Sequence, residues 1–350
     1  MLGRVEGVRV AAIGAVAPAC VVENSDLTQF ADADRKKIID TTGIQRRRKS
    51  PPGLCTSDLC FEAARDVLAS AQVDISEIGL IVFVSQTPDY VLPATSILLA
   101  GRLGATKDCA AFDVNLGCSG YVYGLWQTAS LLRTLGAAKA LLLVGDSSTQ
   151  LVSEEDRSAV ALFGDCGTAT LLSLDDAAEP MVFDMGSDGG GAEHLIVRTG
   201  GFRHRPTAES LERAVGKDGN RRASTELFMD GPQVFNFAVR EVPKSIRTVL
   251  DAADTRVEDV EAAVFHQANR MMLDYLAKRV GLNQEVMRYS IAEYGNTSSA
   301  TVPLTIVAAM ADEVSSGPIK TLVSGFGVGW SWASAVLSLG PMPRPTLREI

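Results

Sequence analysis

Short apolar runs alternate with longer segments of helical spacing along the first half of the chain. The runs are rich in Val, Leu and Ile and are bounded by Gly, Asp or Thr, which is typical of buried strands; they cover residues 79–85, 140–145 and 160–174. Between them, apolar residues recur at helical spacing over residues 57–71, 94–103 and 119–135, with Ser57 as the expected cap. This alternation predicts an α/β protein in which helices cover a parallel or mixed sheet.

The second half repeats the pattern. It predicts strands over residues 262–265, 320–324 and 331–339, and helices over residues 269–280 and 298–311. Strand 79–85 corresponds to residues 262–266, and Gly117-Cys118-Ser119 before one long helix corresponds to Gly295-Asn296-Thr297 before another. We therefore predict two pseudo-repeated halves, residues 1–178 and 179–350, each with one functional turn at a helix N-terminus.

Residues 198–225 interrupt the second half. This segment is rich in Gly and Arg and contains one short helical pattern over residues 208–215. Long excursions inside compact domains are usually binding elements or disordered segments. We expect a cap or docking element here.

Composition excludes several classes of protein. With 350 residues and 46% hydrophobic content the chain is globular, and its net charge of −9 argues against a nucleic-acid binder, which needs a basic face. No apolar run reaches eighteen residues, and Arg4, Glu6 and Arg9 lie near the start. We therefore expect neither a membrane span nor a signal peptide, and we expect a cytoplasmic protein.

Cysteine usage indicates reduced thiols rather than a disulfide framework. The six cysteines are scattered through the first half of the chain, and we expect most of them to be buried: Cys20, Cys55, Cys60, Cys109, Cys118 and Cys166. Cys55 and Cys60 lack a nearby His or a second cysteine pair, so the sequence predicts no metal site.

Cys118 is the strongest candidate for chemistry. It follows an apolar run and precedes a long helical pattern, so its thiol is expected to feel the positive end of a helix dipole, which lowers a thiol pKa. His266 and Asn296 also stand at sharply bounded junctions. A thiol, an imidazole and an amide suit acyl transfer through a thioester: the thiol holds the acyl group, and the other two donate hydrogen bonds to a second thioester carbonyl during decarboxylation of a malonyl unit. A protease-like set would instead use the imidazole as a base. Taken singly, each residue is more typical of a core, strand-end or turn position than of a catalytic one.

Longer motifs carry a resemblance to a known family. These are Phe-His-Gln-Ala-Asn at 265–269, Tyr-Gly-Asn-Thr-Ser-Ser-Ala-Thr-Val-Pro-Leu at 294–304, Ser-Gly-Phe-Gly-Val-Gly-Trp-Ser-Trp-Ala-Ser-Ala at 324–335, Thr-Gly-Ile at 42–44 and Phe-Gly-Asp at 163–165. Together they resemble the 3-oxoacyl-ACP synthase III (KAS III) family of the thiolase-like fold. The resemblance implies a five-layered αβαβα fold, a homodimer, and Cys118, His266 and Asn296 at the bottom of a tunnel.

The resemblance also implies the reaction and further site residues. An acyl-CoA or acyl-ACP would acylate the cysteine, and malonyl-ACP would be decarboxylated and condensed with the acyl group, without a cofactor or metal. Backbone amides of Cys118 and Val328 would form the oxyanion hole. The family pattern assigns the substrate to Leu92, Arg157, Asn269 and Phe326, and carrier-protein docking to Arg270, Lys278 and Arg279.

The chain departs from the family pattern at several positions. Lys37 stands where the family has a Trp that stacks on the adenine of CoA, Leu92 stands where primer-selective members have a Phe, and Val328 stands where the family has a Gly. We expect weaker CoA binding, or delivery by a carrier protein, and a primer longer or bulkier than acetyl. Asn236 replaces a Lys of the docking surface, and the basic run 46–49 fits either a solvated loop or a contact with CoA phosphates.

Two other functions stay open. Proteins of this fold also act as acyltransferases that pass the acyl group to an oxygen or nitrogen nucleophile. A silent subunit of a heterodimer is the third possibility, although this chain keeps all three polar groups. Plant-type polyketide synthases and HMG-CoA synthase relatives share the same three residue types. The residues around Asn296 and the segment Gly327-Val328-Gly329 resemble KAS III more than either of these.

Overall fold

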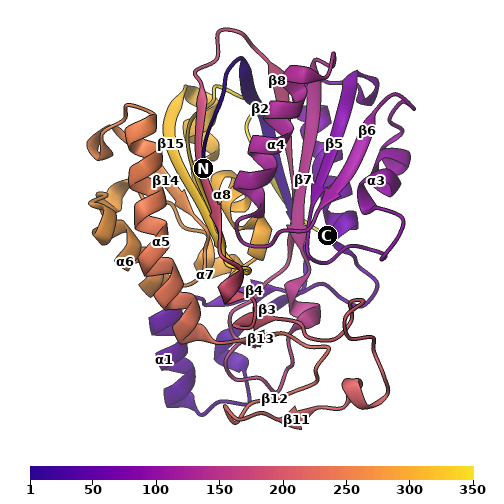
Figure 1. Ribbon diagram of the computed structural model, residues 1–350, viewed down its shortest axis with the longest axis vertical. Coiled ribbons are helices and arrows are strands. Elements are labelled where there is room, and N and C mark those ends of the chain that lie inside the picture. The colour runs from indigo at the N-terminus through magenta and orange to yellow at the C-terminus, as the bar shows by residue number, and fades with distance from the viewer.

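A computed structural model describes all 350 residues (Figure 1). One sheet has six strands in the order β17-β2-β8-β7-β5-β6, with β5 parallel to both of its neighbours and β8 antiparallel to both of its own. Their bounds are β17 (Thr346–Glu349), β2 (Val8–Ala17), β8 (Cys166–Leu174), β7 (Lys139–Asp146), β5 (Ile78–Val84) and β6 (Ala110–Val114).

The second large sheet has five strands in the order β1-β9-β16-β15-β14. Strand β14 runs parallel to β15, and the other pairs are antiparallel. Their bounds are β1 (Leu2–Val5), β9 (Met181–Ser187), β16 (Ser331–Leu339), β15 (Ile319–Gly327) and β14 (Ala262–Phe265). Small pairs complete the set: β3 (Val21–Glu23) with β4 (Arg46–Arg48), β10 (Leu195–Ile196) with β13 (Phe228–Met229), and β11 (Ala214–Val215) with β12 (Arg221–Arg222).

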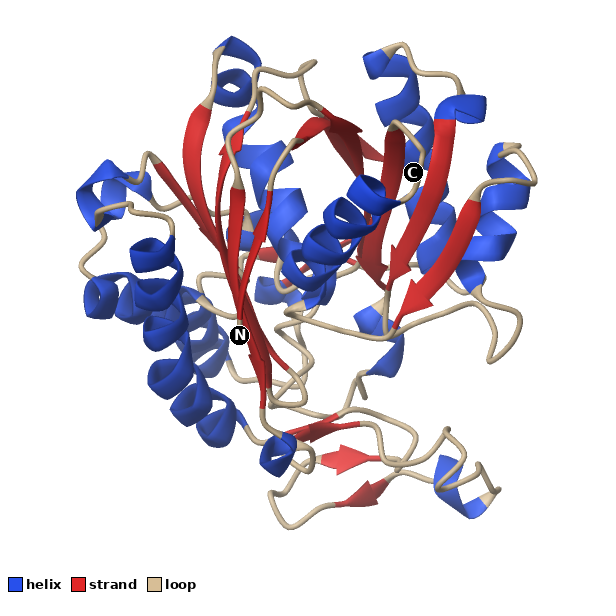
Figure 2. Ribbon diagram, turned by 45° about the horizontal axis from the view of Figure 1, so that its top comes forward, coloured by secondary structure: helices blue, strands red, loops and turns tan.

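Helices fill the space between the sheets and cover both outer faces, as Figures 1 and 2 show. Helices α4 (Gly120–Thr134) and α8 (Thr301–Ser316) lie in the middle, in a core that takes side chains from both sheets. Helices α2 (Thr56–Ala71) and α3 (Thr95–Leu103) pack on the six-stranded sheet, and α5 (Gly231–Ala252) and α6 (Arg270–Val280) pack on the five-stranded sheet. The predicted five-layered αβαβα fold of two similar halves with mixed sheets is confirmed. Two short helices, α1 (Asp32–Thr42) and α7 (Ile291–Tyr294), lie outside this stack.

The terminal strands cross between the two halves. Strand β1 pairs with β9 in the five-stranded sheet, whereas β17 pairs with β2 in the six-stranded sheet. Each large sheet therefore contains one terminal strand from outside the predicted half, 1–178 or 179–350, that supplies its other strands.

Burial on both faces explains the nearly continuous apolar runs in the central strands. Strand β5, Ile-Gly-Leu-Ile-Val-Phe-Val, is buried at every position but Gly79. Close helix packing adds a second constraint, because a Cβ at Gly167 of β8 would lie 2.5 Å from the backbone nitrogen of Cys60 in α2. Only glycine permits this approach of strand and helix.

Three details of the predicted elements are wrong. Residues 160–165 form turns, since the Val160 and Leu162 amides bond back to the carbonyls of Asp156 and Ala159 and the strand starts only at Cys166. The expected helix 208–215 is a 3₁₀ turn followed by β11, because Gly216 and Gly219 close a tight turn to β12. Helix α2 is capped by Cys55 with Asp58 rather than by Ser57.

The cysteines are less buried than expected. Cys60, Cys118 and Cys166 are buried, Cys109 is half-buried, and Cys20 and Cys55 are exposed; all six are free thiols. No helix is long and apolar enough to cross a membrane.

Candidate active site

The structure brings Cys118, His266 and Asn296 to one cavity of about 540 Å³. Cys118 follows β6 and precedes α4, His266 directly follows β14, and Asn296 lies between α7 and α8. All three residues are buried. The cavity therefore joins the two halves of the fold at their equivalent turns.

Cys118 lies against the end of strand β15. A Cβ at Gly327 would lie 2.7 Å from the Cys118 Cβ and 2.8 Å from its Sγ, so this position accepts only glycine. Burial raises the pKa of the Cys118 thiol to about 11, while the Val328 backbone amide and the Ser298 hydroxyl act to lower it. The expectation of a lowered thiol pKa is wrong, because desolvation of the thiolate outweighs the helix terminus and these hydrogen bonds.

His266 is a neutral, oriented imidazole. Its Nδ1 lies 2.8 Å from the Thr301 hydroxyl, which in turn lies 2.9 Å from the Ser298 carbonyl oxygen. Burial lowers the pKa of His266 to about 3. The Phe326 ring meets the imidazole edge-on, with centroids 5.5 Å apart. Because both contacts fix the ring plane, Nε2 is the nitrogen left for a ligand.

Two backbone hydrogen bonds hold Asn296 against the segment 162–164 as an isolated β-bridge. Its N–H donates to the Leu162 carbonyl at 2.9 Å, and its carbonyl accepts from the Gly164 N–H at 3.0 Å. The side-chain Oδ1 accepts from the Ser298 N–H at 2.9 Å. The amide Nδ2 is therefore the group free to donate a hydrogen bond into the cavity.

Sequence reasoning missed two residues that hold this site together. Thr301 orients His266, and Asp146, at the end of β7, is a fully buried carboxylate that accepts from Ser299 and from the Gln86 N–H. Asp146 also lines a small pocket beside Cys118. A signal existed in the sequence, because a carboxylate that ends a continuous apolar strand needs buried donors.

Three of the four expected substrate residues line the cavity: Arg157, Asn269 and Phe326. Asn269 also caps α6 by accepting from the Met272 N–H at 2.8 Å. Leu92 does not join them; it is 77% exposed in the single chain and lines neither cavity beside Cys118.

Arg157 is already occupied by contacts within the chain. It pairs with Asp34 at 3.2 Å, lies 5.1 Å over the Phe30 ring, and its backbone amide donates to Asn220. Lys37 lies in the same groove. The groove at the cavity mouth therefore presents one paired guanidinium and one flexible ammonium.

The pocket on the other side of Cys118 is small, about 50 Å³ in the single chain. Its walls combine polar groups with Val328, Leu151, Phe163, Leu195 and Leu227. Phe163 borders this pocket and the large cavity alike. The space next to the thiol is therefore mostly apolar and is set by a few side chains.

The expected docking residues differ in availability. Arg270 pairs with Asp274 at 2.8 Å and lies 4.0 Å over the Tyr289 ring. Lys278 and Arg279 are exposed in the last turn of α6 and form no ion pair. Only these two cations of the set are free for a partner.

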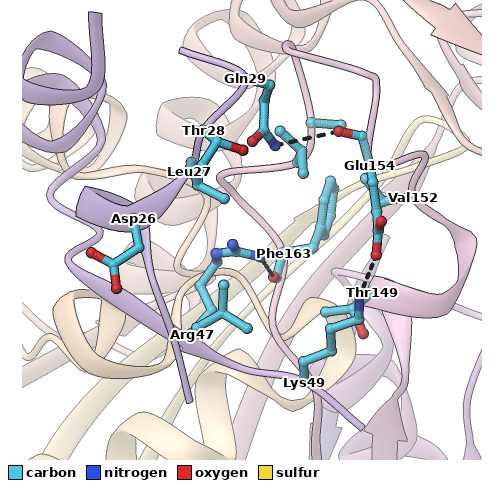
Figure 3. Close-up of a pocket in the computed structure, with 13 residues that line it drawn as sticks. Asp26, Leu27, Thr28, Gln29, Arg47, Lys49, Thr149, Val152, Glu154 and Phe163 are labelled. Atoms are coloured by element: carbon cyan, nitrogen blue, oxygen red, sulfur yellow. Dashed lines mark hydrogen bonds and ion pairs between the residues drawn. The ribbon is translucent and has the colours of Figure 1, made fainter. Parts of the chain in front are cut away.

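A second cavity of about 420 Å³ has Phe163, Arg47 and Thr149 among its lining residues, as Figure 3 shows. Arg47 on its wall is 4% exposed, donates to the Asn24 side chain at 2.9 Å and to the Phe163 carbonyl at 3.1 Å. Arg48 is also buried and pairs with Glu349. The basic run 46–49 was expected to be either a solvated loop or a contact with CoA phosphates. Neither alternative holds at Arg47 and Arg48, because both side chains are buried and bind residues of the same chain.

Two sequence models of one family match the chain. The model of 3-oxoacyl-[acyl-carrier-protein (ACP)] synthase III matches residues 112–189, and the model of its C-terminal region matches residues 250–339. These ranges contain all three residues at the base of the cavity.

Relatives and solved structures match over nearly the full length. A beta-ketoacyl-[acyl-carrier-protein] synthase III of Desulfitobacterium hafniense is 33% identical over 93% of this chain and 95% of its own. One from Rhodopirellula baltica is 34% identical over 96% of this chain and 99% of its own. The crystal structure of a 3-oxoacyl-(acyl-carrier protein) synthase from Burkholderia xenovorans is 37% identical, covers 99% of each chain and superposes with a TM-score of 0.94.

Proposed function

Because the chain belongs to the 3-oxoacyl-[acyl-carrier-protein] synthase III family, we propose that Cys118, His266 and Asn296 carry out its condensation reaction. The protein is an acyltransferase that joins an acyl group to the two-carbon unit of a malonyl carrier protein. The products are a 3-oxoacyl carrier protein and CO₂. The observation that carries the assignment of roles is the meeting of thiol, imidazole and amide in one buried cavity.

In the first half-reaction, the Cys118 sulfur attacks the thioester carbonyl of the acyl donor. A bond forms between sulfur and the acyl carbon, the donor's carbon–sulfur bond breaks, and the thiol proton leaves with the departing thiol. The backbone amides of Cys118 and Val328 are our oxyanion hole for this step. The Val328 amide supports this role, because it already donates toward the thiol.

In the second half-reaction, malonyl thioester loses CO₂ and its carbonyl oxygen gains negative charge. Asn296 Nδ2 and His266 Nε2 donate hydrogen bonds to this oxygen. Donation from Nε2 of a neutral ring requires that Nδ1 accepts the Thr301 proton, so the Thr301 hydroxyl must turn this proton from the Ser298 carbonyl toward the ring during this step. The carbanion then attacks the acyl carbon, and Cys118 is released as a thiolate that takes up a proton.

The acyl donor follows from the groove at the cavity mouth. Lys37 offers no aromatic face for an adenine, and Arg157 is engaged by Asp34 and Phe30. We propose that acyl-CoA binds weakly and that an acyl carrier protein is the better donor. We also propose a primer longer or bulkier than acetyl. Such a primer needs more room than the small pocket beside Cys118 offers in the single chain, so its binding requires a rearrangement around Val328 and Phe163.

Assembly, cofactors and location are further proposals. We propose a homodimer, in which the exposed loop that carries Leu92 is covered by the second copy. We propose that the condensation needs neither a metal nor a cofactor, because the loss of CO₂ from the malonyl unit leaves an electron pair on the remaining carbon and so forms the carbanion. We propose that the protein works in the cytoplasm.

Intact-mass spectrometry and CO₂ release test the residue roles together. Cys118→Ala is expected to lose the acyl adduct and yet to release CO₂ from malonyl carrier protein. His266→Ala and Asn296→Ala are expected to keep part of the adduct and to lose CO₂ release. The assignment is wrong if Asn296→Ala condenses at the wild-type rate.

The alternative of acyl transfer to an oxygen or nitrogen nucleophile is not favoured by the family match. The same assay separates it, because a pure transferase releases no CO₂. A silent subunit would form no adduct at all. Incubation with mixed acyl-CoA and acyl carrier-protein donors would report donor class and chain length from the mass of the Cys118 adduct.

A further inference from the structure

The excursion at residues 198–225 carries an exposed basic tip, which we define as Phe202, Arg203, His204 and Arg205. Every residue from 202 to 205 is exposed, and the Phe202 side chain is 71% exposed. The stretch 198–207 contains three arginines and one histidine and no Asp or Glu. In a chain with a net charge of −9, this is a local reversal of charge.

The other arginines of the excursion are bound within the chain. Arg198 pairs with Glu193. The remaining ones pair with acidic residues of the excursion, of segment 155–156 or of the position directly after the excursion: Arg213 with Glu226, Arg221 with Glu155, and Arg222 with Asp156 and Asp218. Arg203, His204 and Arg205 form no ion pair and no side-chain hydrogen bond. The excursion thus uses its inner cations for its own structure and leaves the tip free.

An aromatic contact shapes the tip. The Arg205 guanidinium lies 3.9 Å over the Phe202 ring. This stacking holds both side chains together at the surface, so an incoming partner meets a preformed cation beside an apolar ring. Exposed aromatic and arginine side chains of this kind are typical anchors of protein interfaces.

The excursion that carries the tip leaves and returns beside the Cys118 cavity. Leu195 of β10 and Met229 of β13 line that cavity, and Phe202 follows Leu195 by seven residues, at most about 25 Å of extended chain. The excursion also returns to the mouth, where Gly219 and Asn220 share a groove with Arg157. Figure 1 shows β11, β12 and β13 at the same end of the molecule as α1, whose Ile38 lines the cavity.

We propose that the basic tip docks an acidic carrier protein that delivers its thioester arm to Cys118. This deepens the proposed function and rests on it. Positive charge at the tip would steer an acidic partner toward the end of the molecule that carries the excursion, against repulsion by the remaining surface. Arg270 contributes less, because Asp274 neutralises it. The acids nearest in sequence, Glu209 and Glu212, form no ion pair with the tip.

The test compares charge reversal at the tip with charge reversal on α6. The variants are Arg203→Glu with Arg205→Glu, Phe202→Ser, and, as the α6 control, Lys278→Glu with Arg279→Glu. This control removes the two free cations among the docking residues that the family resemblance implies, so it sets one candidate docking surface against the other. Each is assayed for condensation with malonyl carrier protein and with malonyl-pantetheine, which has the same arm without the protein. None of the substituted arginine and lysine side chains forms an ion pair or a hydrogen bond within the chain, and the ring on which Arg205 stacks is itself exposed, so the fold is expected to persist.

Charge reversal at the tip is expected to raise the KM for malonyl carrier protein about five- to tenfold, with kcat and the malonyl-pantetheine kinetics unchanged. The increase should shrink as salt rises. A KM within twofold of wild type, or an effect confined to the α6 control, overturns the docking assignment. A change in sedimentation that accompanies the tip variant would instead assign the tip to a contact between copies of the chain.

The outcome is separable from the proposed function. If wild type condenses neither malonyl carrier protein nor malonyl-pantetheine, the proposed function fails. If it condenses both and the tip variant is indistinguishable from wild type, only the docking site fails.

Discussion

The Asp146 carboxylate accepts the Ser299 hydroxyl at 2.6 Å and the Ser299 backbone amide at 3.1 Å. Its second oxygen accepts the Gln86 amide at 2.7 Å. One buried charge thus ties the ends of two strands of the six-stranded sheet to the segment between Asn296 and α8. Asp146 therefore connects the half of the fold that carries Cys118 to the half that carries Asn296.

We predict that Asp146→Asn makes Cys118 more reactive while weakening the fold. The carboxylate raises the pKa of the Cys118 thiol by charge repulsion, so its removal lowers that pKa and increases the thiolate fraction at pH 8. The rate of alkylation by iodoacetamide should rise at least about twofold. Asp165→Asn removes another buried carboxylate, one not among the groups that shift the Cys118 pKa, and is expected to leave that rate unchanged. A slower rate in Asp146→Asn would contradict the predicted direction.

His266 gives a prediction on pH. With a pKa of about 3 in the folded protein and about 6.5 when unfolded, the imidazole binds its proton only in the unfolded chain between these values. The stability that the neutral ring contributes is therefore complete above about pH 6.5 and is lost as pH falls toward 3, by about 1.4 kcal/mol per pH unit. Urea unfolding at pH 7, 6 and 5 should show a steeper loss for wild type than for His266→Gln. Equal slopes would show that the ring titrates normally.

The sequence predicted the helices and strands well where burial imposes a clear period. Strands 79–85, 140–145 and 331–339 were expected within a residue or two of their bounds, because both faces of each are covered. It failed at residues 160–165, since their apolar character serves the wall of a cavity and the bridge to Asn296 rather than a sheet. Periodicity cannot separate these two uses of apolar residues.

Residue roles that depend on distant partners were less accessible. Thr301 and Asp146 act through hydrogen bonds to residues 35 and 153 positions away in the chain, which no local pattern encodes. Arg270 was expected at a docking surface from its position alone, but Asp274 and Tyr289 occupy its charge. The direction of the Cys118 pKa was also missed, because burial is a property of the assembled layers.

Thr301→Val tests how the imidazole is oriented. Valine keeps the shape but leaves Nδ1 without its partner, so the ring no longer holds one tautomer with Nε2 as the donor. Condensation with malonyl carrier protein is expected to fall about tenfold, whereas alkylation of Cys118 should change little. The matched control is Thr305→Val, one helical turn further along α8, whose hydroxyl bonds Ser290 and not His266. Equal loss in both variants would indicate a general effect on α8.

Gly327→Ala probes the room next to the thiol. The new Cβ would meet the Cys118 Sγ at 2.8 Å and the Cys118 Cβ at 2.7 Å, and both atoms belong to a buried residue that cannot withdraw. Overpacking of this kind costs about 1–3 kcal/mol of unfolding free energy, and relief by moving the thiol displaces it from the Val328 amide. Acylation of Cys118, measured by intact-mass spectrometry, is therefore expected to fall strongly, while the melting temperature falls only moderately. Gly101→Ala on α3, with nothing within 4 Å of its Cβ, should acylate as wild type does. Full acylation of Gly327→Ala would mean that the backbone of β15 can move at this position. The inference that the Val328 amide is held rigidly as part of the oxyanion hole would then be wrong.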